Sequence, residues 1–242
     1  MPQYENGCQI KNEILAFYNS LAADPNHRYR SWEHCYGYFR QHASFRTKAD
    51  YDIASLHLAF YLASWGMYRG SSDLLWKDYK IHKLAILKLL EPKYTSLWRL
   101  NLGDSNYDGV FAELIVSLSE ELKQIYREQI TTVNGKKKNH QPSEILITKI
   151  LLGTVGCTPA CDRFFIIGFR HKLQYSTFGR TFLCRVFQFY REHAAEFLET
   201  QQAISQSGRF DYPVMKLIDM YFSNLGVKLH PESKHSESVN EA

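Results

Sequence analysis

Two aspartates in this sequence stand where a carboxylate can take part in catalysis. Asp162 lies in the run CDRFF, and Asp219 lies in KLIDMYF among apolar residues of the last expected helix. A carboxylate in a cavity can stabilise developing positive charge or activate a water molecule. Structural explanations stay open for both. Asp162 can stabilise a helix N-terminus or pair with Arg163, and Asp219 can form a buried pair with Lys216 or with an arginine of another helix.

A second group of candidate residues lies in WGMYRGSS, residues 65–72, at the end of an aromatic-rich helix. Trp65 and Tyr68 can form stacking walls for a base, although such residues more often belong to the core. An arginine beside hydroxyl groups can bind a phosphate or a base edge, unless it is only a surface side chain near a helix cap. The substrate-binding residues predicted here are Trp65, Tyr68, Arg69 and Ser71.

A glycine-containing turn occupies residues 150–165, which read ILLGTVGCTPACDRFF. Gly153 and Gly156 can end one helix, Thr158 can cap the next, and Pro159 fits its first position. The open amides of that next helix would suit a phosphate, or would meet only water and Thr158. The run 77–83 adds positive charge, which can follow a nucleic-acid backbone or be a solvated helix face. The predicted DNA-binding residues are Gly153, Gly156, Thr158, Lys77, Lys80 and His82.

The segment LGTVGCTPA, residues 152–160, resembles the hairpin of helix-hairpin-helix DNA glycosylases, with Val155, Gly156 and Ala160 in register. The likeness extends over about residues 50–200, because the buried helix 53–67 and helix 74–90 look like the pair that opens that family's core. Three departures stand out. Thr154 replaces the first hairpin glycine, and Cys161 and Asp162 stand at apolar positions after the hairpin. Residues 174–179 contain no carboxylate where the family usually has its catalytic aspartate.

The resemblance implies an enzyme that binds duplex DNA, extrudes a base and hydrolyses its N-glycosidic bond with water and no cofactor. Asp162 or Asp219 must then supply the carboxylate, or the chain only binds. An unusual substrate such as a modified base is expected, in DNA repair or in defence against phage.

Two other classes of function remain open. An all-α ribonuclease or toxin can use an Arg-x4–6-His pair in a dimer, and Arg28 and His34 have five residues between them. A non-catalytic interaction module is the other alternative. The sequence has no G-x-x-x-x-G-K-[ST], G-x-G-x-x-G, G-x-S-x-G or H-E-x-x-H motif, so it gives no support to kinase, dehydrogenase, serine-hydrolase or zincin chemistry.

The elements that must position these residues are helices, because nearly every long segment has helical periodicity. We predict an all-α domain of about nine or ten helices over residues 1–228, with a tail disordered from residue 229 to 242. The polar run 131–142 is an exposed loop or an internal break. The expected helices are 9–23, 30–43, 50–67, 74–90, 93–100, 110–130, 144–153, 158–173, 178–200 and a last one ending near Asn224, capped by Gly226.

Composition is compatible with a nucleic-acid partner but does not demand one. The 242 residues carry a net charge of +4, and 45% are hydrophobic, enough for a sizeable core. The apolar run 53–68 is too short for a membrane span, and the first residues lack a secretory signal, so a cytoplasmic protein with reduced cysteines is expected. Cys157 and Cys161 have metal-like spacing, but Pro159 and the lack of a second pair argue against a metal site. Oligomeric state is left open.

Overall fold

The computed structural model describes residues 6–41, 47–175, 177–207 and 211–230. Helix makes up 75% of the structure and strand 2%, which confirms the all-α class. The α-helices are α1 (Asn6–Ala22), α2 (Ser31–Gln41), α3 (Lys48–Ser64), α4 (Lys83–Leu89), α5 (Asp108–Gln129), α6 (Glu144–Thr154), α7 (Arg163–Leu173), α8 (Arg180–Glu192), α9 (Ala194–Ser207) and α10 (Val214–Leu229). The short 3-10 helices are η1 (Arg28–Arg30), η2 (Gly70–Ser72), η3 (Leu74–Trp76), η4 (Tyr79–His82), η5 (Pro92–Arg99) and η6 (Ser105–Tyr107).

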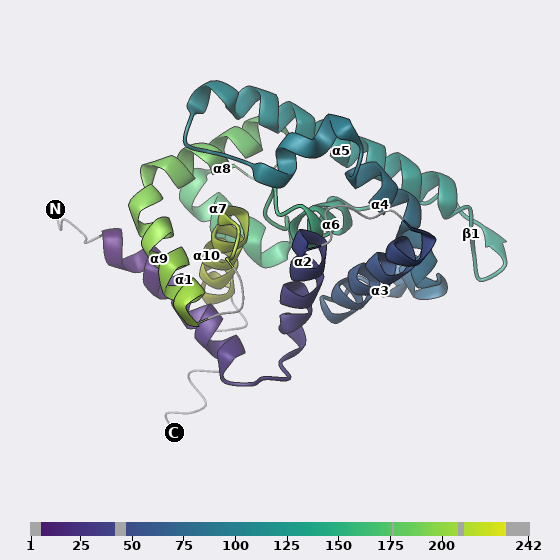
Figure 1. Cartoon of the computed structure of the whole chain (residues 1–242), viewed down its shortest axis with the longest axis horizontal. Helices are drawn as coiled ribbons and strands as arrows, with labels where there is room; N and C mark the ends of the chain where they lie inside the picture. The colour runs from purple at the N-terminus through teal and green to yellow at the C-terminus, as the bar shows by residue number, and fades with distance from the viewer. Residues whose placement is uncertain (1–5, 42–46, 176, 208–210, 231–242) are drawn as a thin grey trace.

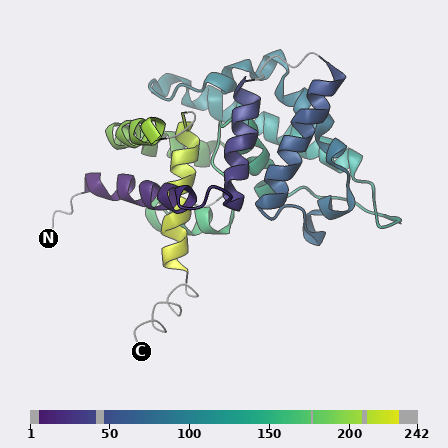
Figure 2. The ribbon, with the colours of Figure 1, turned by 60° about the horizontal axis from the view of Figure 1, so that its bottom comes forward.

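Helix α10 lies near the centre of the molecule (Figure 1), with α1 and α9 on one side and α2 and α3 on the other. Figure 2 shows α10, in yellow, crossing α1. Helices α7 and α10 approach most closely where two glycines meet. A Cβ atom on Gly168 would lie 2.1 Å from the carbonyl oxygen of Phe222, and one on Gly226 would lie 1.8 Å from that of Phe164. Neither glycine can carry a side chain in this packing.

Several expected helix boundaries are wrong, and three of them have a local reason. The segment 74–90 is divided into η3, η4 and α4, because Asp78 accepts a hydrogen bond from the amide of Lys80 and starts a new turn. The segment 178–200 is divided into α8 and α9 at His193, whose ring packs against Phe189 and contacts Glu196. Gly226 is inside α10, not at its cap, because the helix continues to Leu229.

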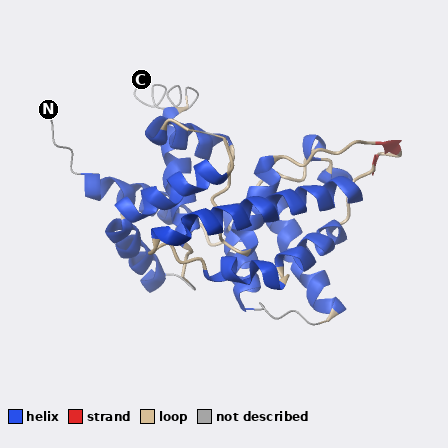
Figure 3. Cartoon of the chain, turned by 90° about the horizontal axis from the view of Figure 1, so that it is seen from above, coloured by secondary structure: helices blue, strands red, loops and turns tan. Residues whose placement is uncertain are grey.

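The segment after α5, expected to be an exposed loop or an internal break, forms a β-hairpin. Strands β1 (Thr132–Val133) and β2 (Lys136–Lys137) pair antiparallel. Asn134 and Gly135 have φ values of 50° and 76°, the left-handed conformation that an Asn-Gly hairpin turn requires. The hairpin projects at one end of the molecule (Figure 3). Buried residues before and after it belong to the same hydrophobic cluster.

The chain beyond α10 was expected to be disordered from residue 229. Leu229 belongs to α10, and His230 is buried, with its ring hydrogen-bonded to Arg163. The expected tail therefore begins too early by at least two residues. The rest of it, residues 231–242, lies outside the described residues.

Candidate functional site

A cavity of about 420 Å³ lies where the end of α3 meets α6, α7 and α10. We call it the central cavity. It is lined by Trp65, Arg69, Asp162 and Asp219, four of the residues that the sequence singled out. These residues are spread over more than half of the chain, and the fold brings them to one place.

Asp162 both caps a helix and faces the central cavity. Its Oδ1 accepts a hydrogen bond from the amide of Phe165 at 3.2 Å, so α7 begins at Arg163. Its Oδ2 lies 3.7 Å from Nζ of Lys149, and its side chain is 24% exposed. The helix-cap explanation is therefore correct. The cap uses only Oδ1, so Oδ2 is left facing the ammonium group of Lys149.

Asp219 is the more deeply buried acid, and both of its oxygens are engaged. Oδ2 accepts a hydrogen bond from Nζ of Lys216 at 2.8 Å, and Oδ1 accepts one from the amide of Ala160 at 3.1 Å. Burial raises the pKa of Asp219, and the Lys216 ammonium partly offsets this. The expected buried pair with Lys216 is confirmed. Asp219 ties α10 to the turn that leads to Asp162.

Lys149 is a site residue that the sequence analysis missed. It donates a hydrogen bond to the carbonyl oxygen of Trp65 at 3.0 Å, and its side chain is only 7% exposed. Burial lowers the pKa of its ammonium group, while the carboxylates of Asp162 and Asp219 act in the opposite direction. A signal was present, because Lys149 interrupts the apolar run ILITKILL of α6.

Aromatic rings form one wall of the central cavity. Trp65 packs against Tyr29 of η1 with their ring centroids 4.4 Å apart, and the Arg28 guanidinium lies 4.6 Å from the Tyr29 centroid. Nζ of Lys216 lies 4.6 Å from the Trp65 centroid. The indole N–H of Trp65 is buried and has no hydrogen-bond partner in the described part of the chain. The wall thus combines flat rings, nearby cations and an unused donor.

Tyr68, expected as a wall of the substrate pocket, and His82, expected on a DNA-binding face, contact each other instead. The Tyr68 hydroxyl contacts Nε2 of His82 at 2.9 Å, and Nδ1 of His82 contacts the Tyr126 hydroxyl at 2.6 Å. Burial lowers the pKa of His82 to about 3, so the ring is neutral at ordinary pH. The expectation that His82 lies on a basic face is wrong, and Tyr68 contacts this interior network, not the central cavity.

The turn between α6 and α7 is buried from Val155 to Cys161, so its amides are not open to a phosphate in this conformation. Gly153 lies against the Tyr61 ring, where a Cβ would come within 2.3 Å, and Gly156 takes a φ of +73°. Thr158 is fully buried and does not cap a helix, because α7 begins five residues later at Arg163. These glycines serve close packing.

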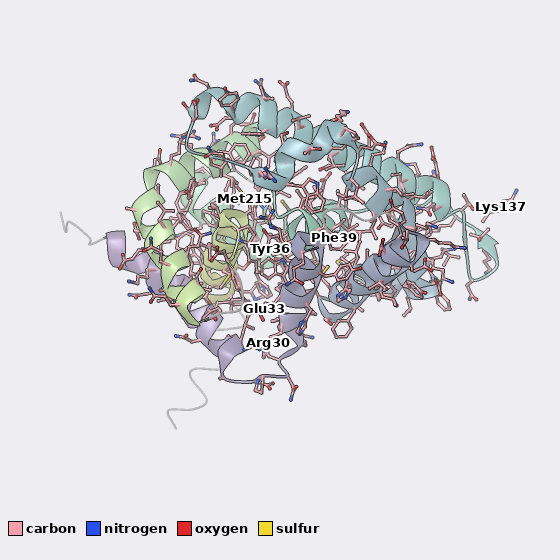
Figure 4. The ribbon with its side chains drawn as sticks, in the orientation of Figure 1. Arg30, Glu33, Tyr36, Phe39, Lys137 and Met215 are labelled. Carbon is pink, nitrogen blue, oxygen red and sulfur yellow. The ribbon has the colours of Figure 1, made fainter. Side chains whose placement is uncertain are left out.

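Lysines cluster at the hairpin end of the molecule. Nζ of Lys77 donates a hydrogen bond to the carbonyl oxygen of Thr132 at 2.6 Å, which joins the 77–80 segment to the hairpin. Lys80 is exposed, as are the three hairpin lysines 136–138. Figure 4 shows Lys137 at the outer tip of the hairpin. This end of the protein presents positive charge to solvent.

The ribonuclease pair is not assembled within the central cavity. Arg28 lines the cavity, but His34 is exposed on α2 and does not line it.

A further cavity of about 390 Å³ lies between α2 and α10, with Tyr36 and Met215 among its walls (Figure 4). It contains none of the predicted catalytic residues.

Comparison of the chain with protein-family models, with curated proteins and with solved structures gave no match. Among the described residues, no helix has the length and apolar character that crossing a membrane requires. Within the same residues, no group of three histidine, cysteine, aspartate or glutamate side chains is arranged to hold a metal ion. Cys157 and Cys161 are buried and are not joined by a disulfide.

Proposed function

We propose that the protein binds a nucleotide in the central cavity and hydrolyses its N-glycosidic bond, with Asp162 as the catalytic carboxylate. The observation that carries the proposal is the setting of Asp162. One of its oxygens lies beside a buried lysine, in a cavity that also has an aromatic wall and three arginines. Asp219 is a positioning residue, because its two oxygens are used within the protein.

Cleavage of an N-glycosidic bond passes through a state with positive charge on the sugar, which a nearby carboxylate stabilises. Water then attacks the anomeric carbon as the bond to the base nitrogen breaks. The hydroxyl group joins the sugar, and the proton of that water ends on the released base. Asp162 would stabilise the positive sugar and accept the proton in transit.

The surroundings of Asp162 suit the base and the backbone of such a substrate. Tyr29 and Trp65 supply ring surface, and the buried indole N–H of Trp65 can donate to a base acceptor. Arg28 and Arg69 lie at the cavity and can bind phosphate. The lysines of the hairpin end would add contacts that weaken with salt. DNA bearing a modified base is the substrate we favour.

The test is formation of alkali-labile sites in duplex and single-stranded DNA carrying unmodified, deaminated, alkylated or phage-type modified bases. We expect such sites on one substrate, and their loss in Asp162→Asn. Asparagine is also a good helix cap, so α7 should be kept.

The matched control is Asp104→Asn, because Asp104 also caps a helix, by accepting a hydrogen bond from the amide of Asn106, but lies outside the central cavity. Full activity of Asp162→Asn, or no alkali-labile site on any substrate, would contradict the proposal.

A further inference from the structure

A second, smaller cavity of about 250 Å³ lies beside the central one. Six of its lining residues carry hydrogen-bond donors, one of them a permanent cation, and none of its lining residues is acidic. The six are Arg69, Ser71, Ser72, His140, Gln141 and Ser143. A lining of donors and positive charge without a carboxylate suits an oxyanion.

His140 lines this cavity and has a buried ring nitrogen without a hydrogen-bond partner among the described residues. The residue is 2% exposed, and its Nδ1 contacts Oδ2 of Asp73 at 2.8 Å. This contact engages Nδ1 and leaves Nε2 as the other polar atom of a residue that lines the cavity. Nε2 is buried and has no hydrogen-bond partner in the described part of the chain. A buried polar atom without a partner is costly, and a ligand would satisfy it.

Asp73, the partner of His140, has an uncommon backbone conformation. Asp73 has a φ of 59°, which is rare for a residue other than glycine. Lys138 lies 3.5 Å from its other carboxylate oxygen. Asp73 can accept the Nδ1–H of His140, which fixes the ring and leaves Nε2 as its remaining polar atom.

The N-terminus of α6 adds to the same region. Ser143 lines the small cavity and caps this 11-residue helix by accepting a hydrogen bond from the amide of Leu146 at 3.2 Å. The first turn of a helix carries partial positive charge. Its acid, Glu144, is paired with Lys123 and does not line the cavity.

We infer that the small cavity binds a phosphoryl group of the same nucleotide whose base enters the central cavity. Arg69 is the link, because it lines both cavities. This inference rests on the proposed function, since it assigns the second half of the same substrate. The substrate class is therefore a nucleotide with its phosphate, rather than a free nucleoside or base.

The test uses NMR of protein with 15N-labelled histidine, titrated at constant ionic strength with inorganic phosphate, deoxynucleosides and deoxynucleoside 5′-monophosphates. The His140 signal is identified by its absence in His140→Gln. We expect it to shift and saturate with phosphate and with monophosphates but not with nucleosides. At least one monophosphate should bind about tenfold tighter than phosphate, because its base also finds contacts.

A second variant leaves the buried His140–Asp73 pair unchanged, so that a loss of binding is not caused by misfolding. Ser71 is exposed, so Ser71→Glu should fold while placing a negative charge in the small cavity, and the His140 shift should disappear. Ser96→Glu is the matched control, because Ser96 is exposed on η5 and lines neither cavity, and it should bind like wild type. An unsaturable shift, or one that Ser71→Glu leaves unchanged, overturns the inference.

The outcomes separate this inference from the proposed function. Tighter binding of a monophosphate than of phosphate supports the inference even when no DNA substrate is cleaved. Equal binding of phosphate and all monophosphates overturns it even when Asp162 proves catalytic.

Discussion

The turn 150–162 and the segment 65–73 look alike in sequence, since both place glycines, hydroxyl groups and a charge at the end of an apolar helix. Their settings differ. The turn is buried, and its glycines fit against Tyr61 and Tyr36. The segment 65–73 instead turns Trp65 and Arg69 toward cavities. The glycine spacing of the turn therefore indicates close packing, whereas the segment 65–73 supplies side chains to the cavities.

The two regions are nevertheless connected through Asp219, whose Oδ1 accepts the amide of Ala160 in the turn. The turn thereby fixes the position of Asp162, two residues further on. A substitution in the packing region should therefore act through stability, and one in the cavity should act through function.

The largest expected effect is on the packing side, from Gly226→Ala. A Cβ there would lie 1.8 Å from the carbonyl oxygen of Phe164, so α7 and α10 must separate. We expect a loss of about 3 kcal/mol or more in the free energy of unfolding, measured in urea. Gly103→Ala is the control, because its Cβ would meet only the Asn101 side chain. Equal urea midpoints for the two variants would refute this account of the packing.

The two aspartates test the same contrast within the site. Asp219→Ala leaves Lys216, which is 1% exposed, without its partner, and should cost about 3–5 kcal/mol of stability. Asp162→Asn should cost less than about 1 kcal/mol and yet abolish base release. Thermal unfolding and the alkali assay together check both. If Asp219→Ala kept its stability and lost base release while Asp162→Asn was unstable, the roles of the two aspartates would be exchanged.

The buried His82 should make the stability of the protein depend on pH. Its pKa is about 3 in the folded protein, against about 6.5 for an unfolded chain, so acid protonates the unfolded state first. Stability should fall as pH drops below about 6.5, by about 2 kcal/mol at pH 5. Urea unfolding at several pH values should show a flatter profile for His82→Asn than for wild type and for His34→Asn, whose histidine is exposed. Parallel profiles would contradict a neutral buried His82.

The smallest expected effect is at the basic end. Lys80→Ala should change stability by less than about 0.5 kcal/mol, because the side chain is exposed. If Lys80 contacts a DNA phosphate, the slope of log affinity against log salt should fall by about 1. Lys48→Ala, at the far end of α3 from Trp65, should leave the slope unchanged. An identical slope in both variants would remove Lys80 from the DNA face.

Much of the local structure followed from the sequence. Periodicity predicted the helices, and a buried pair with Lys216 was one of the two structural explanations given for Asp219. Each depends on residues close together in the chain. The start of α7 at Arg163 was missed. Thr158 and Pro159 are residue types that commonly begin a helix, so the helix was expected to start there. Only the tertiary structure shows that Asp162 caps it.

The sequence by itself determined the helical class and the residue types that can do chemistry, because helix periodicity and side-chain chemistry are local properties. It could not reveal that Lys149 lies beside Asp162, or that His140 pairs with Asp73 across 67 positions. It also could not show that His82 is interior. Burial and pairing depend on contacts between distant segments, so the tertiary structure alone decided which polar residues are packed away and which meet in a cavity.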